Sequence, residues 1–429
     1  MQPEPRSARA GNRLRQPKRP AGLPRLRGLT GVGSLLCAIL VAVSGPVTSA
    51  DWNRVAEAFD RRFVDTLDEA DVPGGAYVIV HAGLIVGMGS FGHTDSQRQR
   101  PVDSATVFRI ASLSKGFSGV LAALLADEAG IALNQPVAGY SPSIRLEPNA
   151  ERPLTIEDVL GQRSGFIRNA YDNLIEAGKT RDEILPRFNT LEPICPPGRC
   201  YSYQNNVFSL VEDVIASSSG NSFEEAVTER LFAPLGMTRA SVGYDALIRV
   251  DNRAAPHLKT RSGWYGTEPR STYYQVPSAA GINASILDMA QWAIAMLGHR
   301  PRIVPPAVIE EVLTPRIRTR RELRNRHWRG LLDDAWYGLG WRIYRVDDMQ
   351  LALHGGWVAG YRAEIALSHD LDVGLVILSN AETRAVGELN REFWDLALAH
   401  ALTKEAATTT AANAQSPSSP TEAPDEPGS

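Results

Sequence analysis

A serine followed by a lysine three positions later is the strongest chemical signal in this sequence. The pair is Ser112 and Lys115, and no other serine of the chain has a lysine at that distance. Residues three apart on a helix share one face, so the amine is expected beside the hydroxyl. A buried lysine with a lowered pKa can take the serine proton, which makes the serine a nucleophile. The pattern predicts a nucleophile at a helix start, where its own backbone N–H can stabilise an oxyanion.

A Tyr-x-Asn pattern occurs twice and offers partners for this pair. Tyr203 and Asn205 precede an apolar run at residues 207–215, whereas Tyr171 and Asn173 lie in a polar stretch that we interpret as a loop. A tyrosine beside a lysine cation ionises more easily and can relay protons. The amide of Asn205 can hold both the lysine and a substrate carbonyl.

A third pattern, His354 followed by two glycines and Trp357, ends a strand candidate. The glycines, among them Gly356, would let a substrate backbone approach the strand edge closely. Taken alone, a histidine at a strand end is more often structural, so this pattern is weaker than the first.

The elements that must position these residues come from both ends of the chain. A helix is expected over residues 51–70, a hairpin over 76–80 and 84–86, strands over 338–346, 350–354, 361–367 and 373–379, and a final helix over 388–401. This order predicts an α+β fold (an α/β sandwich), with one antiparallel sheet and flanking helices built from residues 51–110 and 286–403. Residues 111–285 are expected to form an inserted, mostly helical domain. Within and just after it, three capping boxes begin at Thr155, Ser222 and Ser285.

The two ends of the chain have different expectations. Residues 1–50 hold eight Arg or Lys against one acid, then an apolar run at 31–43 and small residues before Asp51. This is the pattern of a secretory signal peptide, which predicts a periplasmic or secreted protein. A membrane anchor that stays uncleaved is the alternative. Residues 404–429 are rich in Ala, Thr, Ser and Pro, and we expect a disordered tail.

Composition and cysteine spacing narrow the function. Hydrophobic residues make up 43% of the chain, which predicts a folded core. The residues after position 50 carry a net charge of −10 (37 basic against 47 acidic), which argues against a general nucleic-acid binder.

Cys195 and Cys200 enclose a turn-forming stretch, so a disulfide between them is a candidate after export, with two free thiols as the alternative. No zinc-type spacing, phosphate loop or Gly-x-Ser-x-Gly elbow is present. The glycines at residues 87–92 match the dinucleotide pattern, but no helix is expected after them.

The three patterns in this order resemble the serine β-lactamase and penicillin-binding-protein superfamily on its class C side. That group includes D,D-peptidases, D-aminopeptidases and related esterases. The resemblance covers about residues 55–400 and extends to the stretches at residues 107–116, 154–165, 231–237, 337–341 and 375–380. It implies a site between the sheet and the helical domain.

The resemblance also implies roles for the site residues. Ser112 would attack a carbonyl, and Lys115 and Tyr203 would handle its proton. Asn205 and His354 would position the substrate, and the backbone N–H groups of Ser112 and Trp357 would form an oxyanion hole. No metal or organic cofactor is implied. The expected partner is a small-molecule substrate, and the expected state is a monomer.

Two departures from the class C pattern leave the substrate open. The third motif has His354 where class C enzymes usually carry a lysine, and the second reads Tyr-Gln-Asn. A β-lactam is the first expectation, because the overall likeness is to class C. A D-amino-acid peptide or a small carboxyl ester is the runner-up, and a catalytically dead domain that binds cell-wall peptides is a third hypothesis.

Overall fold

The fold is described from a computed structural model that covers residues 49–97, 100–141, 143–144 and 152–415. The expected signal peptide lies almost wholly outside these ranges, as do residues 416–429 of the expected tail. The described residues belong to one compact unit, Thr48–Ser429, so the expected division at residues 110 and 286 stays a prediction. Among them, no helix is long and apolar enough to cross a membrane.

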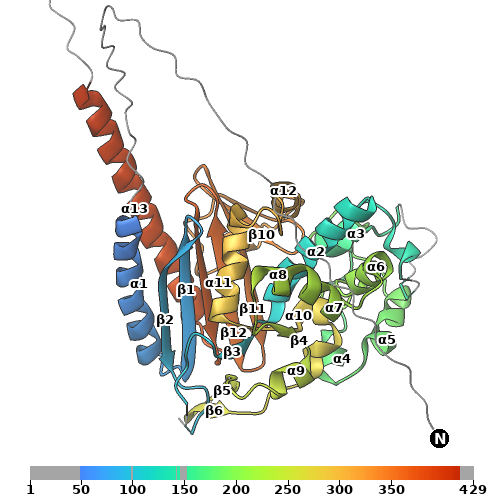
Figure 1. Ribbon diagram of the computed structural model, residues 1–429. Coiled ribbons are helices and arrows are strands. Elements are labelled where there is room, and N and C mark those ends of the chain that lie inside the picture. The colour runs from blue at the N-terminus through green and yellow to red at the C-terminus, as the bar shows by residue number, and fades with distance from the viewer. Residues whose placement is uncertain (1–48, 98–99, 142, 145–151, 416–429) are drawn as a thin grey trace, which may run out of the picture. The chain divides into compact units, whose positions relative to one another are not determined.

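One antiparallel sheet forms the centre of this unit (Figure 1). In spatial order its strands are β2 (Leu84–Gly92), β1 (Gly74–His81), β13 (Val373–Ser379), β12 (Tyr361–Ser368), β11 (Met349–Val358), β10 (Arg342–Val346), β9 (Asp334–Tyr337) and β8 (Ile317–Arg318). The N-terminal hairpin therefore pairs with the last strand, as the sequence predicted.

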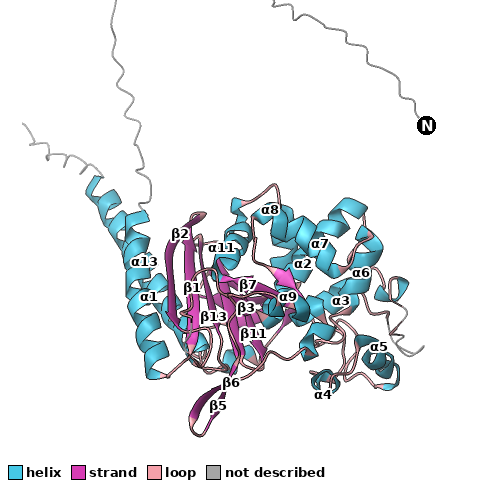
Figure 2. Cartoon of the chain, turned by 60° about the horizontal axis from the view of Figure 1, so that its bottom comes forward, coloured by secondary structure: helices cyan, strands magenta, loops and turns pink. Residues whose placement is uncertain are grey.

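Both faces of the sheet are covered by helices (Figure 2). Alternate side chains of a strand point to opposite faces, so Ala76, Val78 and Val80 of β1 join one core while Tyr77 and Ile79 join the other. The second core is closed by two helices that pack against each other, α1 (Ser49–Glu69) and α13 (Ala385–Gln415). On the first face, α11 (Ile286–Ile294) packs on β1 and β13.

Short helices and strands fill the middle of the chain, as expected for a mostly helical region. Its helices are α2 (Ser114–Ala129), α3 (Ile156–Leu160), α4 (Asp172–Glu176), α5 (Arg181–Ile184), α6 (Leu210–Ser219), α7 (Phe223–Val227), α8 (Ala233–Leu235), α9 (Tyr244–Ile248) and α10 (Pro277–Ala280), with α12 (Pro306–Leu313) after α11. Two small sheets accompany them, β3 (Val107–Arg109) with β7 (Ile282–Ser285) and β4 (Ser241–Val242), and the hairpin β5 (His257–Thr260) and β6 (Gly263–Gly266).

The three capping boxes begin α3, α7 and α11 as predicted, and a fourth at Thr180 begins α5. Several boundaries differ from expectation, and three of them bear on the site or on the expected tail. The strand expected over residues 338–346 begins only at Arg342, because the preceding segment turns closely over α2. At Gly340 the backbone φ is 81°, and a Cβ there would lie 2.1 Å from the carbonyl oxygen of Lys115. Residues 171–173, expected as a loop, contain the start of α4. The tail that was expected to be disordered from residue 404 is helical up to Gln415. Helix α13 continues through Lys-Glu-Ala-Ala at 404–407, because these residues are strong helix formers.

Candidate active site

Ser112 lies on a tight turn directly before α2. A 3-10 helix, Ala111–Leu113, leads into α2, and Ala111 has a φ of 51°, an uncommon value for a residue with a side chain. Strand β11 lies against this turn, since a Cβ at Gly356 would be 2.3 Å from the carbonyl oxygen of Ile110. Gly356 therefore allows the protein's own backbone to pack closely here. Gly355 lines the cavity that also contains Ser112, so it is the glycine that a substrate backbone could approach.

Lys115 is fully buried beside Ser112. Its Nζ lies 3.3 Å from Ser112 Oγ and donates to Asn205 Oδ1 at 2.7 Å and to the carbonyl oxygen of Ala279 at 2.9 Å. Burial, with a smaller effect from the Arg342 charge, lowers the pKa of Lys115 to about 7, against an opposing effect of Asp172. The two carbonyl acceptors take two N–H bonds, so the neutral amine can direct its lone pair at the Ser112 hydroxyl. This is the geometry that a serine activated by a general base requires.

Tyr203 faces the same lysine. Lys115 Nζ lies 4.7 Å from the centre of its ring. Burial raises the pKa of Tyr203 above its ordinary value, although a hydrogen bond with Ser112 and the charge of Arg342 act in the opposite direction. The expectation that the lysine makes this tyrosine ionise more easily is therefore wrong, because burial outweighs the neighbouring cations. Tyr203 is a neutral phenol at neutral pH, able to donate a proton.

Three hydrogen bonds with Gln162 hold the segment that carries Tyr203. The Gln162 side-chain oxygen accepts from the backbone N–H of Gln204 at 2.5 Å, its amide donates to the Gln204 carbonyl at 3.1 Å, and its backbone carbonyl accepts from Ser202 at 2.9 Å. Sequence reasoning did not single out Gln162, because nothing local distinguishes it.

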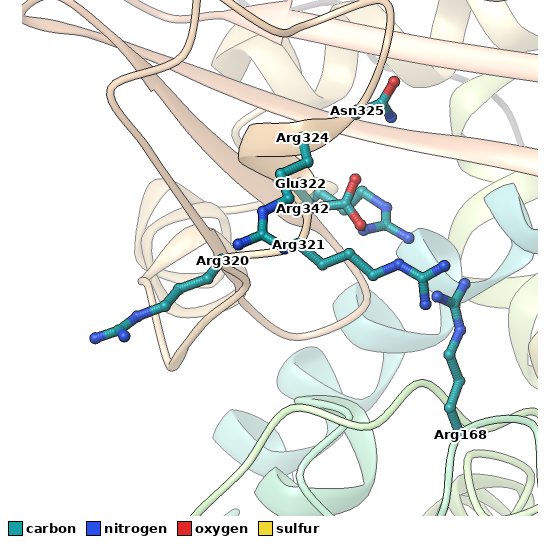
Figure 3. Close-up of a pocket in the computed structure, with 7 residues that line it drawn as sticks. All are labelled: Arg168, Arg320, Arg321, Glu322, Arg324, Asn325 and Arg342. Atoms are coloured by element: carbon teal, nitrogen blue, oxygen red, sulfur yellow. The ribbon is translucent and has the colours of Figure 1, made fainter.

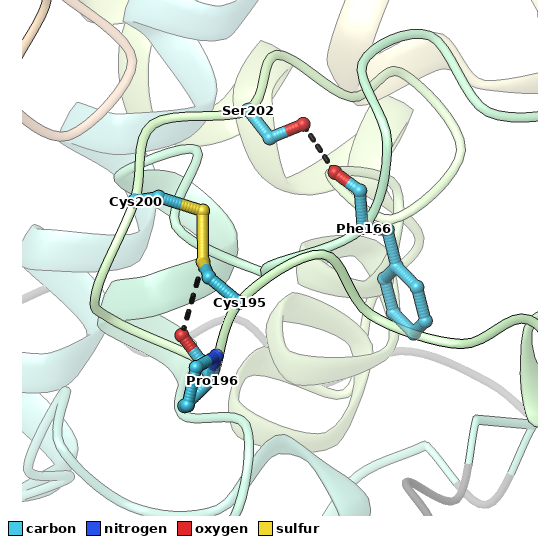
Figure 4. Close-up of a disulfide and its surroundings, with 5 residues drawn as sticks. All are labelled: Phe166, Cys195, Pro196, Cys200 and Ser202. Atoms are coloured by element: carbon cyan, nitrogen blue, oxygen red, sulfur yellow. Dashed lines mark hydrogen bonds between the residues drawn. A yellow bond between two sulfur atoms is a disulfide. The ribbon is translucent and has the colours of Figure 1, made fainter.

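A disulfide joins Cys195 and Cys200 just before this segment (Figure 4). Their Cα atoms are 6.3 Å apart, within bridging range. The figure also shows the Ser202 hydroxyl donating to the carbonyl oxygen of Phe166. The bridge is thus one of several restraints on the chain around Tyr203.

Asn205 connects the lysine to a half-buried carboxylate, that of Asp172. Its Oδ1 accepts from Lys115, and its Nδ2 donates to Asp172 Oδ2 at 2.8 Å. One amide N–H stays available for a substrate carbonyl. Burial raises the pKa of Asp172, although Asn205 and Lys115 act in the opposite direction. Asp172 belongs to the Tyr-x-Asn copy that was set aside as a loop, so sequence reasoning missed a charged residue of the site.

His354 is buried and uncharged. Its Nδ1 lies 2.9 Å from the carbonyl oxygen of Gly355, which can only accept, so Nδ1 carries the proton and Nε2 accepts from the Tyr337 hydroxyl at 3.0 Å. Burial lowers its pKa well below 6.5, and the charges of Arg342 and Lys115 lower it further. In this uncharged form His354 has no positive charge with which to bind a substrate carboxylate.

The cation near the serine is Arg342 at the start of β10. Its guanidinium carbon lies 5.9 Å from the centre of the Tyr203 ring, and its Nη1 is 2.6 Å from Glu322 Oε1. Sequence reasoning missed it, although it directly follows the 337–341 stretch that carried part of the resemblance.

A cavity of about 550 Å³ opens over these groups. Its lining includes Ser112, Asp172, Glu176, Tyr203, Asn205, Arg342, Gly355 and Trp357. Trp357 is 63% exposed, and its indole donates to Glu382 Oε2 at 2.7 Å. Its backbone comes from the strand that packs against the Ser112 turn, but its oxyanion role stays a prediction. Within the described ranges, no three His, Cys, Asp or Glu side chains are grouped as metal ligands.

A family model described as Beta-lactamase matches residues 59–399. The chain belongs to the beta-lactamase family. With Lys115 beside Ser112, it is a serine hydrolase of that family. Its resemblance to the wider superfamily, predicted from the sequence, is confirmed.

Known proteins of the beta-lactamase family differ in what they are called. A D-aminopeptidase of Cereibacter sphaeroides is 28% identical over 73% of this chain, and the match spans 58% of that relative's own length. A beta-lactamase of Escherichia coli is 22% identical over 80% of this chain and 93% of its own.

Two solved structures show the same fold. An octameric penicillin-binding protein homologue from Pyrococcus abyssi has a TM-score of 0.70 and 24% identity over 80% of this chain and 76% of its own. A D-amino acid amidase from Ochrobactrum anthropi has a TM-score of 0.67 and 18% identity over 82% and 99%. The predicted α+β class with its antiparallel sheet is thereby confirmed.

Proposed function

We propose that this protein hydrolyses amides and short peptides that begin with a D-amino acid, through an acyl-enzyme on Ser112. The observation that carries the proposal is the pair of carboxyl groups, Asp172 and Glu176, that line the cavity of the nucleophile. A carboxylate whose pKa is raised by burial gains stability from a cationic partner, and the free ammonium of an N-terminal residue is such a cation. These acids offer nothing to the neutral end of an ester.

The proposal that the substrates begin with a D-amino acid rests on relatives of this chain. The D-aminopeptidases of Cereibacter sphaeroides support it, and the amidase from Ochrobactrum anthropi shares the fold. A β-lactam, the first expectation from the sequence, becomes the second candidate. It is favoured by Arg342, a permanent cation near Ser112 that can pair with a β-lactam carboxylate.

The reaction follows from the contacts. Neutral Lys115 takes the Ser112 proton as Oγ attacks the carbonyl, and a tetrahedral oxyanion forms. The C–N bond then breaks, and the leaving amine takes a proton from the neutral Tyr203 phenol, which is restored from Lys115. Water attacks the acyl ester and gives its proton to the same pair of residues; the bond between the acyl carbon and Ser112 Oγ then breaks, Oγ takes that proton back, and the acid is released.

Four chromogenic substrates test the proposal. D-alanine 4-nitroanilide should be hydrolysed faster than its L isomer, a chromogenic cephalosporin and 4-nitrophenyl acetate. The Ser112→Ala variant should lose turnover, and intact-mass analysis with a slow substrate should place one acyl group on the peptide that contains Ser112. Faster turnover of the cephalosporin would favour the second candidate, and no adduct on any serine would favour a dead binding domain.

The carboxylate pair has its own control. Glu176→Gln should raise KM for D-alanine 4-nitroanilide several-fold and leave KM for its N-acetyl derivative unchanged, because acetylation removes the ammonium. An equal change for both substrates would count against the role of Glu176.

We also propose that the protein is exported. The apolar run at residues 31–43 and the disulfide support this, because disulfides persist outside the cytosol. N-terminal sequencing of the mature protein should begin near Asp51, and a start at Met1 in a membrane fraction would favour the uncleaved anchor.

A further inference from the structure

A second cavity, of about 780 Å³, adjoins the cavity of Ser112 (Figure 3). Arg168, Glu322 and Arg342 line both cavities, so the two spaces share a wall. The remaining charged residues of the second cavity are Arg320, Arg321 and Arg324. Five arginines therefore face one glutamate.

The glutamate neutralises only one of these arginines. Glu322 Oε1 is 2.6 Å from Arg342 Nη1, and its Oε2 accepts from the Tyr344 hydroxyl at 2.8 Å, so both carboxylate oxygens are engaged. The other four arginines are exposed and make no ion pair with the residues that the structure describes. The cavity has an unbalanced positive charge.

Two of these cations oppose each other directly. In the view of Figure 3, Arg168 and Arg321 point toward one another across the cavity that both residues line, whereas Arg320 points away. They come from distant parts of the chain, one from the segment before α4 and the other from the residue before the 3-10 helix Glu322–Arg324. Like charges that meet repel each other, and an anion between them would turn that repulsion into two charge-assisted hydrogen bonds.

The position of the second cavity next to Tyr203 suits it to the leaving-group half of the substrate. Arg342 connects the second cavity to Tyr203, the residue that would protonate the leaving amine. With Tyr203 as the proton donor, the part of the substrate beyond the cleaved bond would extend toward the arginines, while the ammonium would lie with Asp172 and Glu176. We propose that the second cavity is a leaving-group subsite for carboxylates, and that the preferred substrates are short peptides with acidic residues after the N-terminal D-residue. This inference rests on the proposed function.

Binding to an inactive variant tests the subsite without turnover. Calorimetry with Ser112→Ala protein would compare D-Ala-Glu-Glu with D-Ala-Gln-Gln amide, which has no carboxylate. We expect the acidic peptide to bind about tenfold more tightly at low ionic strength, since exposed ion pairs contribute up to about fivefold each. The advantage should shrink in about 0.5 M salt, which screens exposed charges.

Matched substitutions separate the cavity from the general field of the protein. Arg168→Gln and Arg321→Gln, each added to Ser112→Ala, should reduce the advantage of the acidic peptide about threefold. Arg329→Gln removes an equal charge from a nearby exposed residue that does not line the cavity, and should leave the advantage unchanged. Equal affinities for the two peptides, no binding of the acidic one, or an equal loss with Arg329→Gln would overturn the proposal.

Turnover by the wild-type protein distinguishes the two proposals. A preference for the acidic peptide in binding, without cleavage of either, would keep the subsite and reject the aminopeptidase reaction. Cleavage of both peptides with the same KM would keep the reaction and reject the subsite.

Discussion

Burial sets the charge of each ionisable side chain around Ser112. It lowers the pKa of Lys115 and of His354 and raises the pKa of Tyr203, so all three shift toward their neutral forms. Arg342 keeps its charge, because its pKa is raised well above its ordinary value: burial alone would lower it, and the surrounding Tyr201 and Glu322 outweigh that effect. The site therefore combines a neutral amine and a neutral phenol with the permanent charge of Arg342.

Replacement of Lys115 by arginine tests the base. Lys115→Arg keeps a positive charge, but a guanidinium stays protonated near neutral pH. We expect kcat to fall at least about a hundredfold, the usual scale of general-base catalysis, nearly as much as with Lys115→Ala. Retention of most activity by the arginine variant would reduce Lys115 to an electrostatic anchor.

The pH dependence of kcat/KM tests the same group in the unmodified protein. Because the neutral amine of Lys115 is the active form, kcat/KM for the N-acetyl derivative of D-alanine 4-nitroanilide, which has no titrating ammonium, should rise with pH through about 7 and then level off. A profile that falls across this range would contradict the assignment of Lys115 as the base.

His354 gives a second test by pH. Its folded-state pKa lies well below 6.5, so it carries no charge between pH 6 and pH 8. Any change in KM for an anionic substrate over this range should therefore follow the titration of Lys115, with its pKa of about 7, and should persist in His354→Gln. A steady rise in KM from pH 6 to pH 8 that disappears in His354→Gln would restore the histidine as the anion-binding group.

At the scale of elements, the extended segment at residues 201–205 depends on Gln162 more than on the disulfide. The loop closed by the bridge is short, so the Cys195→Ser, Cys200→Ser double variant should lose about 2 kcal/mol of unfolding free energy. It should keep most of its activity, because the three Gln162 hydrogen bonds and the Ser202 bond still hold the segment.

Gln162→Ala should reduce activity more than it reduces the unfolding free energy. It removes both side-chain bonds to Gln204, next to Tyr203, and small displacements of a catalytic group cost up to about a hundredfold in rate. We expect kcat to fall at least about tenfold, measured beside denaturant unfolding of the same proteins. A greater loss of activity in the cysteine variant would show that the bridge positions Tyr203.

At the scale of the whole molecule, the two ends of the described chain close one sheet. Strand β1 pairs with β13, and α1 packs against α13 on the outer face. Among the described side chains of α13, the buried ones lie between Ala385 and Ala397. Removal of residues 404–429 should therefore change the unfolding free energy by less than about 0.5 kcal/mol.

Trp394→Ala is the matched control for that truncation. Trp394 is fully buried between the helices and the sheet, so its loss should cost about 3–5 kcal/mol. A truncated protein as unstable as this variant would mean that residues beyond Thr403 contribute to the fold.

Local rules were enough to predict much of this protein from its sequence. Capping boxes, alternating strands and the Ser112–Lys115 pair depend on residues within four positions, so the sequence by itself predicted the capped helices, the main strands and the placement of Ser112 beside Lys115. The likeness of the ordered motifs supplied Tyr203 and Asn205.

Tertiary structure decided the charges around the nucleophile. Asp172 reaches Lys115 through Asn205, Arg342 lies beside Tyr203 although more than a hundred residues separate them, and Arg168 and Arg321 line one cavity. The same packing keeps His354 uncharged. A pKa depends on burial and on charges within a few ångströms, and these distances exist only after the chain has folded.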